Sequence, residues 1–138
     1  MPNSAEHRAK YELNRAFLDT GLAAIQPEWA AIVAFYAAVH LIERLAASEP
    51  RGPVHSRTHT ERIRYLSRHR QHSALIGDYR LLQEASELSR YYTLHSFRSM
   101  YTAATVQSQL IDTHLVAIEQ YVTAYFPPPP PPAAATGS

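Results

Sequence analysis

The hydrophobic pattern of the chain is dominated by one stretch, Trp29 to Ala47, which reads WAAIVAFYAAVHLIERLAA. From Trp29 to Val39 it contains no charged residue and no helix breaker. A helix that is apolar around its whole circumference is typical of a buried position. The run is short for a membrane span and is interrupted by His40, so we predict a core helix and no membrane partner.

One side of this helix carries polar side chains. Tyr36, His40, Glu43 and Arg44 stand at i, i+4, i+7 and i+8, which places them along one side of a helix. Such a stripe is found either on a core helix whose polar groups are hydrogen-bonded or on one wall of a site. Both interpretations stay open from the pattern alone.

Four further helices are expected from periodicity and capping signals. Asn3 followed by Glu6 has the spacing of a capping box, and so has Thr58 followed by Glu61. Gly21 is a plausible stop for the first helix. The helices are expected over residues 3–20, from residue 58 onward, over 78–91 and over 101–125, with an irregular segment over 93–100.

Periodicity also predicts which residues face the core. Ala9, Leu13, Ala16 and Phe17 form the apolar stripe of the first helix. The inward residues expected on the later helices are Ile63 and Leu66, then Leu81, Leu82, Ala85, Leu88 and Tyr92, and finally Val106, Leu110, Ile111, Ala117, Ile118, Tyr121, Val122 and Tyr125.

The predicted fold class is all-α, an up-and-down bundle of four main helices plus a short helix. The bundle domain is expected over residues 1–126. Six prolines open a tail over 127–138, where we expect an extended, disordered segment that serves as a spacer or docks an SH3-like partner.

The amino-acid composition excludes some classes of function. The 138 residues carry a net charge of +1, so no global basic field draws the chain to nucleic acid, although twelve of the thirteen cations are Arg. The absence of Cys excludes disulfides, zinc ribbons and thiol catalysis. No basic stretch followed by an apolar core opens the chain, so no secretory signal is expected and a cytoplasmic location is predicted.

A short motif, Arg90-Tyr91-Tyr92-Thr93-Leu94-His95, gives the sharpest functional hypothesis. An Arg followed after four to six residues by a His resembles the motif of ribonucleases with a HEPN domain, the higher-eukaryote and prokaryote nucleotide-binding domain. Two other pairs, Arg62 with His69 and Arg64 with His69, have the same spacing. Only Arg90 and His95 lie just before the terminal helix, where that family keeps its motif.

The wider pattern is similar to the same family over about residues 5–125. It has an N-terminal helix, a long helix with the run Phe35-Tyr36-Ala37-Ala38-Val39-His40, a loop with His55 or His59, a helix ending in Leu88-Ser89-Arg90-Tyr91, and a long terminal helix. One departure concerns Tyr91, because family nucleases usually place a polar residue directly after the Arg.

The resemblance implies an RNA- or nucleotide-binding protein, and in its stronger form a metal-independent endoribonuclease of a toxin or defence system. His95 would act as base or acid on a ribose 2′-hydroxyl, and Arg90 would stabilise phosphate charge. The family implies a homodimer without a cofactor, with an antitoxin as a possible partner. The alternative is a non-cleaving HEPN module that partners another protein, such as a minimal nucleotidyltransferase, or a pure interaction bundle.

The other candidate residues are expected to belong to the same site. Tyr36, His40 and Tyr91 are expected to line or back the groove, and His59 and Arg62 to face phosphate at a helix N-terminus. No metal ligand is assigned. A metal-binding bundle in which His40, His55 and His59 converge is the less favoured alternative. His114 is expected in the core or at an interface.

Overall fold

The computed structural model describes residues 2–126, and its regular structure in that range is entirely helical. The all-α fold class is therefore confirmed. The helices, in chain order, are α1 (Ser4–Leu18), α2 (Leu22–Ile25), α3 (Pro27–Ala47), α4 (His59–Arg68), η1 (Arg70–Leu75), α5 (Ile76–Tyr91), α6 (Leu94–Met100), α7 (Ala103–Thr105), η2 (Val106–Leu115) and α8 (Val116–Tyr125).

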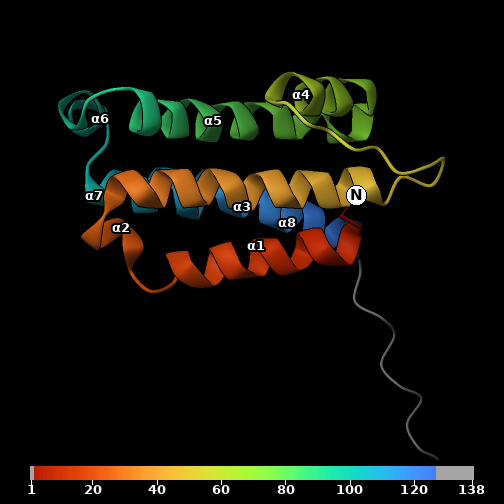
Figure 1. Ribbon diagram of the computed structural model, residues 1–138, viewed down its shortest axis with the longest axis horizontal. Helices are drawn as coiled ribbons and strands as arrows, with labels where there is room; N and C mark the ends of the chain where they lie inside the picture. The colour runs from red at the N-terminus through yellow and green to blue at the C-terminus, as the bar shows by residue number, and fades with distance from the viewer. Residues whose placement is uncertain (1, 127–138) are drawn as a thin grey trace, which may run out of the picture.

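Helix α3 is the central element of the bundle. It lies between α1 on one side and α5 on the other, with η2 and α8 behind it in the view of Figure 1. Pro27 occupies its first turn, where a missing N–H costs nothing. By length and composition α3 could cross a membrane, but 67% of its apolar window is buried inside the bundle, as in a core helix.

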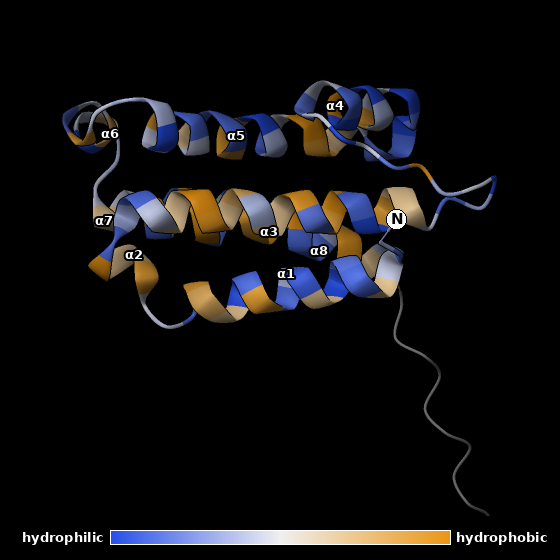
Figure 2. Cartoon of the chain, in the orientation of Figure 1, coloured by the Kyte–Doolittle hydropathy of each residue, from blue (hydrophilic) through white to orange (hydrophobic). Residues whose placement is uncertain are grey.

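The core is built where α3 meets α5 and the terminal helical segment. Apolar residues on the ribbon in Figure 2 concentrate along α3 and on the inward sides of its neighbours. The largest fully buried apolar side chains are Tyr79, Phe35, Phe97, Ile42, Leu45, Leu66, Leu82, Leu110, Ile111, Leu115 and Ile118. Most of these were expected to face inward.

Local capping follows the sequence closely. The backbone N–H of Glu6 donates to Oδ1 of Asn3 (2.9 Å), and that of Glu61 donates to Oγ1 of Thr58 (3.1 Å). The Glu61 carboxylate accepts from the N–H of Arg57, one residue before the cap. Gly21 has a φ of +88° just beyond α1, a conformation that glycine adopts without strain.

The prediction of which face of α1 points into the core is wrong. Leu13 and Phe17 are 73% and 51% exposed, and Ala9 and Ala16 are exposed as well. The helix instead turns its other face inward, because polar groups on that face find partners on α3 and α8. The inward residues are His7, Tyr11, Asn14, Arg15 and Leu18. Leu81 and Tyr92, also expected inside, lie at the surface.

The segment over residues 93–100 is helical and not irregular. Oγ1 of Thr93 accepts from the N–H of Ser96 and caps α6. Phe97 is fully buried, and Nε of Arg98 forms an ion pair with the Glu28 carboxylate at the start of α3. These long-range contacts stabilise a helix of only seven residues, which has little stability of its own.

The terminal helical segment contains an unusual turn geometry. Residues of η2 form a π-helix between α7 and α8. Side-chain bonds with the same spacing of five residues join Gln107 to Asp112 and Thr113 to the carbonyl of Ser108. The expected single helix over 101–125 is thus three consecutive segments. The prediction for the tail, 127–138, lies outside the described residues.

Candidate functional site

The polar stripe of α3 contacts two separate groups of residues, which form a first and a second neighbourhood. Tyr36 lies beside the end of α5, whereas His40 and Glu43 lie beside the start of α1. Arg44 lies apart, with its guanidinium 4.0 Å from the centroid of the Phe126 ring.

The first neighbourhood is centred on Arg90, the last cation of α5. Nη1 of Arg90 donates to the Tyr36 hydroxyl (2.9 Å), and Nη2 donates to the Tyr91 hydroxyl. The guanidinium carbon lies 4.7 Å from the centroid of the Tyr91 ring. Arg90 and Tyr36 are thus brought together, whereas His40, which was expected at the same groove, lies beside His7. Tyr91 and Tyr92 are 69% and 65% exposed beside them.

His59 lies next to this group, at the start of α4. Its Nδ1 is 3.0 Å from the Tyr79 hydroxyl and 3.1 Å from Nη1 of Arg62. Arg62 can only donate, so Nδ1 is the acceptor and the neutral ring carries its proton on Nε2. Burial, and then the charges of Arg62 and Arg90, lower the pKa of His59 below its ordinary value. The ring is therefore a neutral N–H donor near Arg90.

Phe35 explains why these groups gather. Its buried ring packs against the rings of Tyr36, His59 and Tyr79, with centroid distances of 5.7, 5.1 and 5.5 Å. Phe35 on α3 thus brings the rings of three other residues together around its own ring. A change at Phe35 would disturb the whole group.

His95 is placed differently from the other motif residue. It lies exposed on the first turn of α6, and within residues 2–126 its side chain forms no hydrogen bond or ion pair. The fold of one chain does not join it to Arg90 by a polar contact. His55 is also exposed and lines a pocket near α1.

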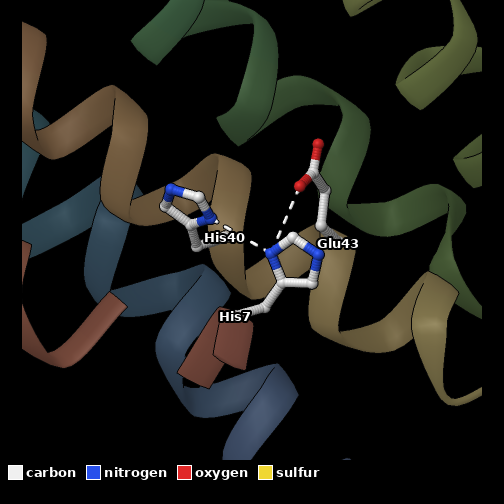
Figure 3. A group of neighbouring side chains, drawn as sticks. All are labelled: His7, His40 and Glu43. Carbon is white, nitrogen blue, oxygen red and sulfur yellow. Dashed lines mark hydrogen bonds and ion pairs between the residues drawn. The ribbon is translucent and has the colours of Figure 1, made fainter. Parts of the chain in front are cut away.

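The second neighbourhood joins α1, α3 and α4. Oε1 of Glu43 accepts from Nε (2.9 Å) and Nη2 (2.7 Å) of Arg62, and Oε2 lies 3.3 Å from Nδ1 of His7. Nδ1 of His7 lies 3.2 Å from Nδ1 of His40. Figure 3 shows the two imidazole rings and the carboxylate converging. Arg62 is largely buried, with its donors used by Glu43 and His59, so it positions these groups.

His7 is the residue that sequence reasoning missed. It was not considered because it lies among charged residues at the start of a helix whose apolar stripe faces another direction. The available signal was the series His7, Tyr11 and Arg15 at steps of four, a second polar line on α1. In the structure that line meets α3 and α8, with Tyr11 and Arg15 both bound to Glu119.

A second histidine cluster lies at the far end of α3. Glu49 accepts from the Tyr65 hydroxyl and lies 3.6 Å from Nε2 of His69 and 3.5 Å from Nε2 of His72. His72 is fully buried, and burial lowers its pKa. On the outer side of α4 and at the start of η1, exposed cations follow one another: Arg57, Arg64, Arg68 and Arg70.

His114 forms an ion pair between helices. Its Nδ1 lies 2.8 Å from Oδ1 of Asp78, so it joins η2 to α5 at a half-buried position. The expectation of a core position is thus met only in part.

Comparison with protein-family models, with curated proteins and with solved structures gives no match for this chain, so its fold and its side-chain geometry carry the functional argument.

Proposed function

We propose that this chain binds RNA or a nucleotide through the surface centred on Arg90, as a HEPN-like helical protein. The observation that carries the proposal is the Arg90 guanidinium, bound to Tyr36 and stacked against the exposed Tyr91 ring. A guanidinium binds phosphate through paired N–H donors, and exposed aromatic rings stack on unpaired bases. The two features lie side by side here.

His59 extends the same surface toward a phosphate. Its neutral ring is oriented by Tyr79 and Arg62 through Nδ1, which leaves Nε2–H as a donor. His59 and Tyr36, which binds Arg90, both pack against the ring of Phe35, so His59 belongs to the same region of the molecule. The exposed Arg residues of α4 supply further positive charge for a longer nucleic acid.

A binding assay tests this proposal directly. Fluorescence anisotropy with short single-stranded RNA at low salt should give saturable binding by the full chain. Arg90→Ala and Tyr91→Ala should each weaken it, by about 1–3 kcal/mol for the stacking residue. Arg80→Ala, an exposed Arg on the same helix, is the matched control and should match the parent. No binding by the parent, or equal losses at Arg80 and Arg90, would refute the proposal.

Cleavage is the stronger form of the same proposal. In it, His95 exchanges protons with the ribose 2′-hydroxyl that attacks the phosphate and with the oxygen that leaves the phosphate. Arg90 stabilises the charge on the phosphate, and the product is a cyclic phosphate. A HEPN-like homodimer would bring two such motifs together, within a toxin or defence system in the cytoplasm. RNA incubated with the chain in EDTA should then be cut, and both Arg90→Ala and His95→Ala should abolish cutting. Intact RNA with the parent would leave the non-cleaving form.

The second candidate is a protein-interaction module, and a different surface favours it. Helices α1, α2 and α3 contact one another (Figure 1), and each of them exposes large apolar side chains: Leu13, Phe17, Ile25 and Trp29. Exposed apolar groups gathered on contacting elements are typical of an interface, such as a homodimer seam or a contact with an antitoxin or nucleotidyltransferase.

Light scattering across a concentration series tests the homodimer. The parent should be a dimer, and Leu13→Glu should convert it to a monomer because a charge cannot be buried unpaired in a seam. Leu81→Glu, at an exposed leucine of α5, should remain dimeric. A monomeric parent would remove the homodimer, whereas RNA binding by that monomer would leave the main proposal standing.

A further inference from the structure

In the triad of His7, His40 and Glu43, one nitrogen atom of His7 faces both of the other groups. A carboxylate can only accept, so the ion pair with Oε2 of Glu43 requires a proton on Nδ1 of His7. The same nitrogen faces Nδ1 of His40, which must then accept. One proton thus serves two acceptors, at 3.3 and 3.2 Å, and both contacts are long for hydrogen bonds to a buried imidazole.

The three groups also lie close enough together to share one metal ion. One ligand atom from each residue lies within 4.8 Å of the other two. Around a tetrahedral ion with bonds of about 2.0–2.1 Å, neighbouring ligand atoms are separated by roughly 3.3 Å. Two of the three separations, from Nδ1 of His7 to Nδ1 of His40 (3.2 Å) and to Oε2 of Glu43 (3.3 Å), agree with that geometry, and the third is within 4.8 Å.

We propose that His7, His40 and Glu43 form a binding site for a divalent transition metal, with Nδ1 of each imidazole and Oε2 of the carboxylate as ligands. On binding, the proton of His7 moves from Nδ1 to Nε2 and the ring stays neutral, so no further reactant is needed. Figure 3 shows the three groups pointing at a common centre from α1 and α3.

The surroundings support this assignment. Arg62 holds Oε1 of Glu43 with two N–H groups, which fixes the carboxylate and leaves Oε2 as its free ligand atom. Ligating carboxylates are usually oriented by such partners. A pocket of about 200 Å³ opens beside the triad, with His55 and Lys10 on its wall. The fourth coordination position therefore faces a space that a water or His55 can fill.

The donor set also selects the ion. Two imidazoles and one carboxylate suit Zn²⁺, Ni²⁺ or Cu²⁺, whereas Mg²⁺ and Ca²⁺ prefer oxygen ligands only. None of the three ligands belongs to the Arg90 surface, although Arg62 contacts both Glu43 and His59. Metal binding is therefore measured separately from RNA binding.

The experiment uses the full chain without a histidine tag, freed of metal by a chelator. Isothermal titration with Zn²⁺ should give one ion per chain, Co²⁺ should give the visible bands of a four- or five-coordinate site, and Mg²⁺ should not compete. His40→Gln and Glu43→Gln should weaken Zn²⁺ binding by about tenfold or more, in line with the loss of metal-site groups. His114→Gln, at a histidine that pairs with Asp78 outside the triad, should bind as the parent does.

A second measurement keeps the test valid if a variant fails to fold. In the ¹⁵N spectrum of the histidine rings of the parent, Zn²⁺ should shift two Nδ1 signals to metal-bound positions. No stoichiometric binding by the parent, equal affinity in His40→Gln, or shifts confined to Nε2 atoms of exposed histidines would overturn the proposal.

Discussion

At the scale of single residues, the structure separates cations that look alike in sequence. Arg62 and Arg64 stand two positions apart on α4, but Arg62 is buried against Glu43 and Arg64 is exposed. Burying a guanidinium is tolerated only when a carboxylate and further acceptors bind it. Glu43 provides that partner, and Arg62 in turn orients Glu43 and His59. A residue expected to face phosphate is therefore an internal anchor.

We expect Arg62→Ala to lower the free energy of unfolding by about 3 kcal/mol, because it leaves the Glu43 carboxylate largely buried without its cation. Arg64→Ala, the exposed neighbour, should change it by less than about 0.5 kcal/mol. Urea unfolding followed by circular dichroism measures both. Equal, small effects would show that the ion pair does not hold α4 against α3.

At the scale of the element, α1 shows that a helix can bury its less apolar face. Its sequence offers a stripe of Leu13 and Phe17 and a polar line that begins at His7. The polar line turns inward because His7 meets His40 and Glu43, while Tyr11 meets Glu119. Leu18 anchors the end of the helix in the core. The cost of burying polar groups is offset when each finds a partner.

This orientation predicts opposite outcomes for two leucines of α1. Leu18→Ala, at a side chain only 3% exposed, should cost about 2–5 kcal/mol of stability by leaving a cavity. Leu13→Ala, at a side chain 73% exposed, should cost about 0.5 kcal/mol or less in the monomeric state. Thermal unfolding of dilute samples distinguishes them. The reverse order would mean that α1 is rotated about its axis relative to the structure described here.

At the scale of the whole molecule, buried histidines make stability depend on pH. Burial lowers the pKa of His7, His59 and His72, and it lowers that of His40 to about 4. In the unfolded chain a histidine has a pKa of about 6.5. Between these values the unfolded state binds more protons than the folded state, so stability falls as pH falls. Above about pH 6.5 the contribution is fully present.

We expect the free energy of unfolding to decrease from neutral pH toward about pH 4, by on the order of 3 kcal/mol from His40 alone. His72 contributes in the same direction, although Glu49 acts to raise its pKa and His69 acts to lower it. His72→Phe should flatten the curve. Urea unfolding at several pH values measures the slope. A parent whose stability does not vary over this range would contradict the burial described for these rings.

Features that depend on residues close together in sequence could be predicted, whereas features that depend on contacts between distant residues could not. The core position of α3 and the caps at Asn3 and Thr58 depend on neighbours in sequence, and the structure confirms them. The helix at residues 94–100 was not predictable, because Phe97 and Arg98 stabilise it through contacts with distant segments. The stripe beginning at Tyr36 was recognised, but its partner His7 lies 33 residues before His40.

The sequence by itself determined the all-α class, the buried central helix and the polar stripe that runs along it, because helical periodicity and capping are local properties. Only the tertiary structure decided what that stripe does. It brings Tyr36 to Arg90 at one end, and His40 and Glu43 to His7 at the other. The physical reason is that a site consists of distances between atoms on separate elements, and these are set when the helices pack.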